Sequence, residues 1–470
     1  MKNLLCFFIV FVFYVAVSYS QDIYYLPGST EKIDQMVGDY DRHSEKATQN
    51  LTDTKYRIWG TDLGVPFTHE GKTYVLFGDI PGDIGYGLDR DPIAFTTDND
   101  PEDGIGLEFI TRSDGTYLPL TIPGISQAAL EVPLDGISIN GNMYVYHSTD
   151  HMTRSVLAKS TDEGRSFTLV DDKISDQFFI NISINKITKS MYQDLPGSDN
   201  EGVVVIGSGT YRQSSAYLYH QPSGEIEDHQ SIQYFAGFRN NKPTWSRNES
   251  DCVPIIEDHC IGELSSAYNP HLNKWVVLYN CDNPRGIVLR MADKPWGPYS
   301  SGEVIFDPDR DNGYCHFIHT NWQVRNCDAV HDPGRENEWG GEYGPYIFKD
   351  LTTRVDSLVT IYYTMSTWNP YTTVLMKSVL VIQDRTNSID HLNYGSEITP
   401  HPNPTSGIFI LPITDIHQSN IKLYNINGKI VYEAKFTEQV NISSLPAGIY
   451  FGSTYENNKS THFFKVLKTD

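Results

Sequence analysis

The stretch Asp62-Leu-Gly-Val-Pro-Phe67, with the turn His69-Glu-Gly71 and the apolar run Tyr74-Val-Leu-Phe77, decides the fold. Two short apolar segments separated by turn residues are typical of a β-hairpin. The first strand of this hairpin begins with a carboxylate. A charged side chain at the start of a strand is informative only if the position recurs.

The same layout recurs four more times along the chain. Carboxylates lead two recurrences, Asp135 and Glu263, and tyrosines lead the other two, Tyr211 and Tyr343. Successive leading residues are 73, 76, 52 and 80 residues apart, whereas compact propeller blades repeat every 40–50 residues or so. We therefore predict an all-β, five-bladed β-propeller with long loops. The five leading residues should meet at one end of its central channel.

Composition and charge narrow the class of partner. The 470 residues contain 30 Tyr, 36 Gly and 25 Pro, with short β-branched or aromatic runs between turn clusters, which is typical of all-β proteins. The formal net charge is −23. Such a surface repels phosphate backbones, so nucleic acid is excluded as an expected partner. A neutral or cationic ligand stays open.

The first 20 residues predict a signal peptide. Lys2 precedes an apolar run from Leu4 to Val17, and small residues stand before Gln21. The run is too short to cross a bilayer comfortably, although a membrane anchor is the alternative. We expect an exported mature chain without a transmembrane segment.

Five cysteines remain after this signal, and an oxidising compartment favours disulfides. The pairs Cys252–Cys260 and Cys315–Cys327 would staple two loops, with Cys281 buried and free. The spacing lacks any CxxC motif, which argues against zinc.

Two segments contain residue types that occur in metal-binding sites. Three histidines and two cysteines gather between Cys315 and His331, but their spacing fits no usual zinc finger. The acidic stretch Asp307–Gly313 resembles a calcium loop, yet the twelfth position is Ile318 where a glutamate is needed. We expect no cofactor and no metal, with a structural calcium at Asp307–Gly313 as the alternative.

The composition changes near His401, which separates a propeller at 21–395 from a small β-sandwich at 399–470. The second region closely resembles the C-terminal sorting domain of the Bacteroidetes type IX secretion system. The phrases that carry the resemblance are Pro402-Asn-Pro-Thr-Ser-Gly407, Leu423-Tyr-Asn-Ile-Asn-Gly-Lys-Ile430, Ile442-Ser-Ser-Leu-Pro-Ala-Gly-Ile-Tyr450 and Lys465-Val-Leu-Lys468. The resemblance implies export through the periplasm and outer membrane, by that machinery, to the cell surface or the medium. A carbohydrate-binding module is the alternative.

Several phrases of the first region resemble the DUF4185 family. They are Gly60-Thr-Asp-Leu-Gly64, Leu76-Phe-Gly-Asp79, Asp91-Pro-Ile-Ala-Phe95, Gly207-Ser-Gly-Thr-Tyr-Arg212, Gly262-Glu-Leu-Ser265, Lys274-Trp275, Pro295-Trp-Gly-Pro-Tyr299, Tyr343-Gly-Pro-Tyr346 and Ser366-Thr-Trp-Asn-Pro-Tyr371. The resemblance implies a five-bladed propeller. Some members of the family are glycoside hydrolases that cleave D-arabinan internally, and many have no assigned activity.

Glycoside hydrolysis needs one protonated carboxyl group and one carboxylate across the scissile bond. Asp62 and Glu263 belong to non-adjacent predicted blades, so they can face each other. Glutamate has the longer reach and the higher intrinsic pKa, so Glu263 is the expected acid and Asp62 the base or nucleophile. Asp135 is expected to raise the pKa of the acid by like-charge proximity. The alternative is that these carboxylates only tie blades together.

Five further residues are expected to contact substrate. Arg212 offers a fixed donor fork to sugar hydroxyls, or forms an inter-blade ion pair. Asp79 is a fourth cavity carboxylate, or caps a turn. Trp368 stacks on a sugar face, or fills core. Tyr211 and Tyr343 complete the set through their leading positions.

Two function classes follow. The first is a secreted glycoside hydrolase that acts on a furanose-containing polysaccharide, in the manner of an endo-D-arabinanase. The alternative is a non-catalytic glycan-binding propeller, a lectin or adhesin at the cell surface. A monomer is expected in either case.

Overall fold

The computed structural model describes residues 21–80, 90–128, 130–282, 285–384, 396–413, 420–425, 429–456 and 459–469. The predicted signal segment, residues 1–20, lies outside the described residues. Regular structure in these ranges is almost entirely strand. The helical elements are one short helix, α1 (Thr52–Tyr56), and the 3-10 turns Ser223–Glu225, His229–Ser231 and Glu249–Asp251.

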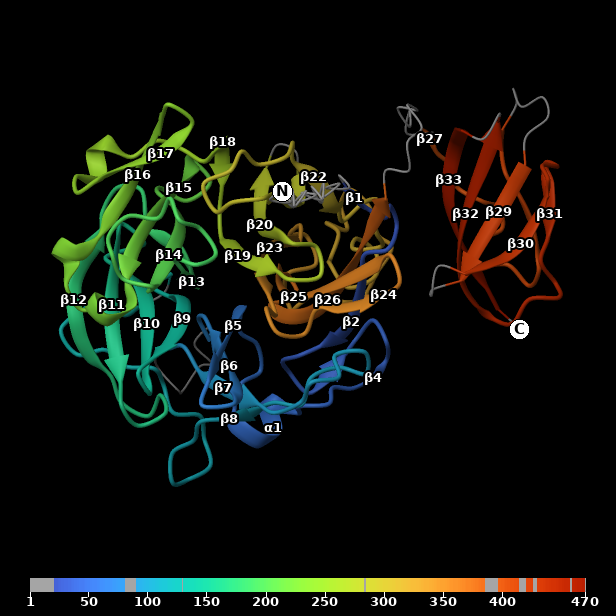
Figure 1. The fold of residues 1–470 in the computed structure, drawn as a ribbon. Coiled ribbons are helices and arrows are strands. Elements are labelled where there is room, and N and C mark those ends of the chain that lie inside the picture. Colours follow the sequence, from blue (N-terminus) through green and yellow to red (C-terminus); the bar gives the residue numbers. More distant parts are fainter. Residues whose placement is uncertain are drawn as a thin grey trace, which may run out of the picture.

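Five antiparallel sheets stand around a common centre, as Figure 1 shows, and form a five-bladed propeller. The innermost strand of each sheet contacts the innermost strands of both neighbours, and the ring closes from the last blade onto the first. In chain order these strands are β5 (Leu63–His69), β9 (Pro133–Ile139), β13 (Asn181–Thr188), β19 (Leu264–Asn269) and β23 (Gly341–Ile347).

Each sheet adds its remaining strands outward from the centre. They are β6 (Lys72–Phe77), β7 (Ile93–Thr96) and β8 (Glu108–Phe109) in the first blade; β10 (Asn142–Thr149), β11 (Arg154–Ser160) and β12 (Thr168–Ser175) in the second; β14 (Glu201–Ser208), β15 (Ser214–Pro222), β16 (Gln233–Arg239), β17 (Lys242–Ser246) and β18 (Ile256–Ile261) in the third; β20 (Lys274–Asp282), β21 (Arg285–Ala292) and β22 (Glu303–Phe306) in the fourth; and β24 (Thr353–Val355), β25 (Leu358–Trp368) and β26 (Thr372–Asp384) in the fifth.

The middle strands of the blades are buried on both faces because neighbouring blades cover them. Every residue of β10 after Asn142 and every residue of β14 after Glu201 is buried. Such strands read as continuous apolar runs rather than as alternating patterns. The outer strand β12 is mostly exposed or half-buried, because only its inner neighbour covers it.

The N-terminal strands of the propeller region join its last blade. Strand β1 (Gln21–Tyr25) pairs with β26 at the outer edge of the last blade, with Ile23 opposite Ile382. Strand β2 (Glu31–Gln35) pairs with β26 as well, and β3 (Tyr40–Asp41) and β4 (Lys46–Ala47) form a small ribbon. The first and last parts of the propeller sequence are thereby joined by backbone hydrogen bonds.

The prediction that Tyr211 begins a blade was wrong. Tyr211 does not lead an innermost strand, because it follows β14 in the connection to β15. The innermost strand of the third blade is β13, an apolar segment that begins at Asn181. The predicted hairpin around Tyr211 is therefore the middle of that blade.

The turn between β11 and β12 is an Asp-box, and its role is structural. The backbone N–H of Ser166 donates to Oδ1 of Asp162 at 2.9 Å, and that of Gly164 donates to Oγ of Ser160 at 2.9 Å. Gly164 has φ of 84°, which favours glycine, and Phe167 is buried beneath the turn.

The C-terminal region is a separate β-sandwich with its own core. Its strands are β27 (Ser396–Glu397), β28 (Ile408–Ile410), β29 (Asn420–Asn425), β30 (Ile430–Lys435), β31 (Gln439–Asn441), β32 (Gly448–Glu456) and β33 (Lys459–Lys468). The core residues, which include Phe409, Leu423 and Phe464, form a cluster that contains no propeller residue.

Candidate active site

A cavity of about 630 Å³ opens at the end of the ring where the innermost strands begin. Seven of the eight residues predicted from the sequence line it, and Asp135 does not. Its charged and aromatic lining residues are Asp62, Asp79, Glu263, Asp282, Glu342, Arg212, Arg285, Tyr211, Tyr343, Tyr371, Trp339 and Trp368. Five carboxyl groups face two arginines, so the cavity carries a negative balance.

Asp62 stands immediately before β5 and is buried. Tyr343 donates its hydroxyl to Oδ2 of Asp62 at 2.8 Å. The other oxygen, Oδ1, is buried and has no hydrogen-bond partner among the described residues. A β-carbon on Gly78 would lie 2.1 Å from this oxygen, so only glycine at that position leaves room for the carboxylate.

Glu263 occupies the corresponding place before β19, in a non-adjacent blade. The backbone N–H of Asn280 on β20 donates to its carbonyl at 3.3 Å, as that of Gly78 donates to the Asp62 carbonyl at 2.9 Å. Oε2 of Glu263 is buried and also lacks a partner in the described part of the chain. Two acids thus hold equivalent positions in separate blades, each with one oxygen unsatisfied.

Burial raises the pKa of Asp62 to about 7, because the charged form loses its hydration. The hydroxyl of Tyr343, which donates to Oδ2, opposes this rise, and the negative charges of Glu263 and Asp91 reinforce it. The groups that shift the pKa of Asp62 most include no cation. A carboxyl group of this kind is partly protonated at neutral pH.

Burial raises the pKa of Glu263 as well, but a cation opposes the rise. Arg212 lowers this pKa by its positive charge, and the polar side chain of Tyr211 lowers it further. A neighbouring cation thus favours the ionised form of Glu263, and the negative charge of Glu263 favours the protonated form of Asp62.

Asp135 lies deeper in the ring and belongs to a different environment. Its Oδ2 accepts from the backbone N–H of Ile184 at 2.8 Å and pairs with Nζ of Lys349 at 3.5 Å. Its Oδ1 accepts from the N–H of Gly136 at 2.7 Å. Burial raises its pKa, and Lys349 opposes that rise.

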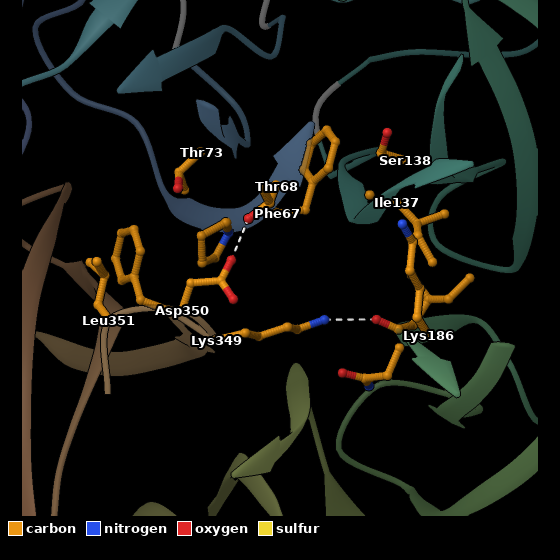
Figure 2. Close-up of a pocket in the computed structure, with 14 residues that line it drawn as sticks. Phe67, Thr68, Thr73, Ile137, Ser138, Lys186, Lys349, Asp350 and Leu351 are labelled. Carbon is orange, nitrogen blue, oxygen red and sulfur yellow. Dashed lines mark hydrogen bonds between the residues drawn. The ribbon is translucent and has the colours of Figure 1, made fainter. Parts of the chain in front are cut away.

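A second, smaller cavity of about 240 Å³ lies at the opposite ends of the innermost strands, next to Asp135. Figure 2 shows Lys349 extending across this cavity, where Nζ donates to the carbonyl of Ile184 at 2.7 Å. Thr68 donates to Asp350 beside it. Asp135 thus ties three blades together, and the expectation that it acts on the acid of the catalytic pair is not supported.

Asp135 stands closer to the end of its strand, and so to the hairpin turn, than Asp62 and Glu263 do in theirs. Asp62 stands seven residues before the end of its strand, and Glu263 stands six before the end of its own. Asp135 stands only four residues before Ile139. Val132 takes the equivalent place in the second blade, where its carbonyl accepts from Ser148.

The predicted sugar contacts lie on the cavity wall. Arg212 pairs with Asp282 at 2.8 Å, and its guanidinium lies 5.1 Å from the centre of the Tyr211 ring. Asp79 accepts the backbone N–H of Leu130 at 2.8 Å. Trp368 is 42% exposed, so it is not a core residue.

The sequence interpretation missed several residues of the site. Glu342 is buried and pairs with Arg285 through both of its oxygens, each at 3.2 Å. Burial raises the pKa of Glu342, and Arg285 opposes the rise. Tyr371 donates to the carbonyl of Asp79 at 3.0 Å. The sequence contained a signal for both residues. Glu342 stands directly before the phrase Tyr343–Tyr346, and Tyr371 is the last residue of the phrase Ser366–Tyr371.

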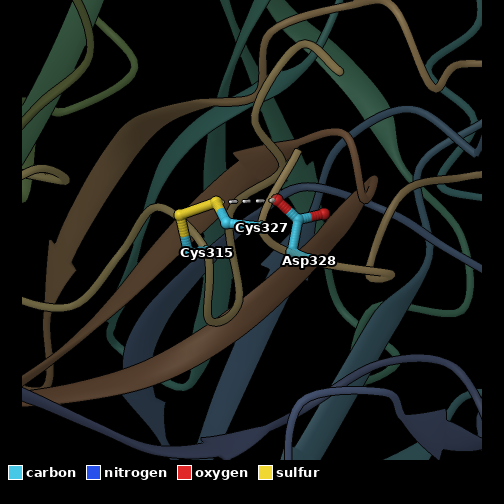
Figure 3. Close-up of side chains that lie close together, drawn as sticks. All are labelled: Cys315, Cys327 and Asp328. Atoms are coloured by element: carbon cyan, nitrogen blue, oxygen red, sulfur yellow. Dashed lines mark hydrogen bonds between the residues drawn. A yellow bond between two sulfur atoms is a disulfide. The ribbon is translucent and has the colours of Figure 1, made fainter. Parts of the chain in front are cut away.

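The cysteine pairing was half right. Cys315 and Cys327 form the predicted disulfide, shown with the neighbouring Asp328 in Figure 3. The other disulfide joins Cys260 to Cys281, and Cys252 is buried and free. Strand β18, which carries Cys260, lies beside the end of β20, and this proximity is not visible in the sequence.

In the histidine cluster near this disulfide, His319 and Asp328 bond each other. The ligand atoms of His319, Asp328 and His331 lie within 4.8 Å of one another. His319 bonds Oδ1 of Asp328 through Nδ1 at 2.5 Å and the carbonyl of Glu336 through Nε2 at 2.9 Å. Both of its ring nitrogens are used within the protein.

The acidic stretch that imitates a calcium loop is bonded internally in the same way. Asp311 accepts the N–H of Asp307 at 2.7 Å and pairs with Arg310 at 2.8 Å. Asp307 in turn accepts the N–H of Asp309 at 2.9 Å. The carboxylates of Asp307 and Asp311 therefore stabilise the turn to which they belong.

Comparison with family models assigns both regions. A model described as "Domain of unknown function (DUF4185)" matches residues 47–377, and one described as "Secretion system C-terminal sorting domain" matches residues 400–468. The sorting domain directs export by the type IX system to the cell surface or the medium. No curated protein matches the chain. Among the described residues, no helix is long and apolar enough to cross a membrane.

Solved structures with distant similarity include glycoside hydrolases. The catalytic domain of a GH62 α-L-arabinofuranosidase from Coprinopsis cinerea is 12% identical, with a TM-score of 0.40 and coverage of 78% of this chain and 100% of that chain. A GH43_1 enzyme from Xanthomonas citri is 11% identical, with a TM-score of 0.39 and coverage of 68% and 87%. At such low TM-scores, nothing about the activity of this chain follows from them.

Proposed function

The chain belongs to the DUF4185 family, and from that premise and the paired acids of the cavity we propose that it is a secreted glycoside hydrolase. Its substrate is a furanose-containing polysaccharide, and the reaction is internal cleavage of the kind found in arabinan-degrading members of the family. The observation that carries the proposal is the pair Asp62 and Glu263. Both are buried, both line one cavity, and each has one unpartnered oxygen.

The charges around the pair favour Asp62 as the general acid. Its pKa of about 7 keeps a proton available near neutral pH, whereas Arg212 favours the ionised form of Glu263. This assignment reverses the one that intrinsic pKa and side-chain reach suggest. Asp62 would give its proton to the leaving oxygen as the glycosidic C–O bond breaks. The carboxylate of Glu263 would activate water or attack the anomeric carbon.

The cavity favours a neutral glycan. Five carboxyl groups against two arginines would repel uronic acids and sulfated sugars. Arg212, Tyr211, Tyr343 and Asp79 are placed to bond sugar hydroxyls as donors and acceptors, and exposed Trp368 offers an apolar face. We propose no metal or other cofactor, because acid–base hydrolysis needs none.

The alternative is a glycan-binding propeller, a lectin or adhesin, that holds sugar without cutting it. The exposed Trp368 on the cavity wall suits either function. The buried acids favour the enzyme, because two neighbouring carboxyl groups with unpartnered oxygens are costly to bury and give a neutral-sugar binder little in return. We propose a monomer in both cases.

The test is incubation of the full-length protein with plant, algal and mycobacterial polysaccharides, including arabinans, followed by measurement of new reducing ends. We expect Asp62→Asn and Glu263→Gln each to lower the rate by about 10²-fold or more. Glu257→Gln, at an exposed carboxylate on β18, is the matched control and should cleave normally. Retention on a glycan column without cleavage, unchanged by both substitutions, would replace the hydrolase with the lectin.

A further inference from the structure

We propose that Trp339 and Trp368 form an aromatic platform that binds sugar residues next to the cleavage point and makes the protein favour polymers over short substrates. The inference rests on the proposed function, because it places a subsite in the same cavity. Two segments build it. They are the 307–340 connection between β22 and β23, which carries Trp339, and the end of β25 with the turn that follows it, which carries Trp368.

Trp339 and Trp368 differ from the other tryptophans in the solvent exposure of their side chains. Trp339 is 38% exposed and Trp368 is 42% exposed, and among the described residues they are the only exposed tryptophans. Both line the cavity that contains the acid pair. They also lie near each other, since Trp368 pairs with Gly341, two residues after Trp339. Large aromatic rings left in water at the mouth of a cavity are typical of binding sites.

The orientation of the Trp368 ring is fixed from one side. The guanidinium of Arg335 lies 3.6 Å from the ring centre. Arg335 is itself held by Glu338 at 3.0 Å and by Asp332 at 3.7 Å. The arginine stacks on one face of the indole, so the remaining exposure belongs to the rest of the ring.

Trp339 is held in a similar manner. Its ring packs against Tyr314, with centroids 5.1 Å apart in an edge-on arrangement. The guanidinium of Arg325 lies 5.6 Å from its ring centre and pairs with Asp309 at 2.7 Å. Both tryptophans are therefore supported by an arginine that an acid holds in place.

Asn369 joins the two segments into one unit. Its side chain donates to the carbonyls of Arg335 and Glu338 at 3.0 and 2.9 Å and accepts from the N–H of Asp332 at 2.9 Å. It is fully buried and has φ of 55°, a conformation that asparagine tolerates better than most residues. The Cys315–Cys327 disulfide closes the same connection.

A rigid pair of apolar faces beside polar groups matches the chemistry of sugars. One face of a sugar ring presents C–H groups, which pack on an indole, while its hydroxyls need donors and acceptors such as those in the cavity. A platform that is already ordered loses little conformational entropy on binding. Its contacts reach sugar residues beyond the scissile bond, so a polymer gains from them and a short aryl glycoside does not.

The test compares Trp339→Ala and Trp368→Ala with the full-length wild type on linear arabinan and on an aryl arabinofuranoside. We expect each change to lower kcat/KM on arabinan about tenfold, mainly through KM, the scale that 1.4 kcal/mol of lost contact produces. Rates on the aryl glycoside should change less than about twofold. Trp339→Phe and Trp368→Phe should recover most of the loss, and Phe238→Ala, at an exposed ring on β16, should have no effect.

Retention in gels that contain arabinan gives a second readout that does not need cleavage. Wild-type retention that both alanine variants lose supports the platform, even if the protein cleaves nothing and the hydrolase proposal fails. Cleavage of arabinan with unchanged retention and KM in both variants overturns the platform while the hydrolase stands. Equal losses on the polymer and the aryl glycoside, or no wild-type retention at all, also overturn it.

Discussion

Tyr343 donates its hydroxyl to Oδ2 of Asp62 at 2.8 Å, so the last blade of the propeller supports the proposed acid of the first. The bond favours the ionised form of Asp62 and lowers its pKa against the effect of burial. The phenol also fixes the carboxyl group and leaves Oδ1 as the oxygen without a partner. The closure of the ring thus orients a group that the proposed chemistry needs.

Removing this hydroxyl should move the pH profile. In Tyr343→Phe the ionised form of Asp62 loses a donor, so its pKa should rise above about 7. We expect the alkaline limb of kcat/KM to move to higher pH relative to wild type, because that limb reports deprotonation of the acid. A limb that stays in place, or moves to lower pH, would show that Asp62 is not the group titrating there.

Asp62 should also make stability depend on pH. Its folded pKa of about 7 lies above its ordinary value of 3.8, so the folded state retains a proton that the unfolded state releases. This contribution is complete below about pH 4 and is lost as the pH rises through 7. Asp62→Asn avoids the loss, so its stability relative to wild type should increase from pH 4 to pH 8, by roughly 2–4 kcal/mol.

Urea unfolding of both proteins at several pH values between 4 and 8 measures this difference. Glu257→Gln, at the exposed carboxylate, is the matched control for the loss of one carboxyl group. A constant difference between Asp62→Asn and wild type would mean that Asp62 titrates with an ordinary pKa.

Asp135 should matter for stability rather than for chemistry. Asp135→Ala leaves Lys349 and the backbone N–H of Ile184 without their partner, and we expect a loss of roughly 3 kcal/mol in the free energy of unfolding. Adding Lys349→Met should recover part of that loss. The folded fraction of Asp135→Ala should keep its kcat, and a stable variant with kcat lowered a hundredfold would return Asp135 to the catalytic group.

The recurring pattern predicted the five-bladed fold because propeller strands carry local signals. A buried middle strand is a continuous apolar run, and hairpin turns are marked by residues such as Asn140-Gly141. The pattern also placed Asp62 and Glu263 correctly in one cavity. It misplaced Asp135 because the distance from the lead residue to the turn was ignored, and register depends on that distance.

Other contacts of the site could not be predicted from short stretches of sequence. Arg285 meets Glu342 across two blades, and Cys260 meets Cys281 through strand β18. These contacts depend on how long connections pack, and sequence spacing carries little information about that. Trp339 lies in such a connection, so nothing in its neighbourhood marked it as a cavity residue.

The sorting domain should be separable from the propeller. Removal of residues 399–470 leaves every propeller core intact, because the sandwich has a core of its own. We expect the truncated protein to unfold at a similar temperature but to stay in the periplasm, measured by fractionation of cells that express it. Export of the truncated chain to the medium at the normal level would contradict the sorting assignment.

The most direct test of the central claim compares leaving groups in the two carboxyl variants. With a substrate whose leaving group needs no protonation, such as a dinitrophenyl arabinofuranoside, Asp62→Asn should recover most of the wild-type rate, because the missing acid is no longer required. Glu263→Gln should stay impaired on that substrate and regain activity when azide is added. Recovery in Glu263→Gln instead would exchange the two roles, and wild-type activity in both variants on arabinan would refute the pair.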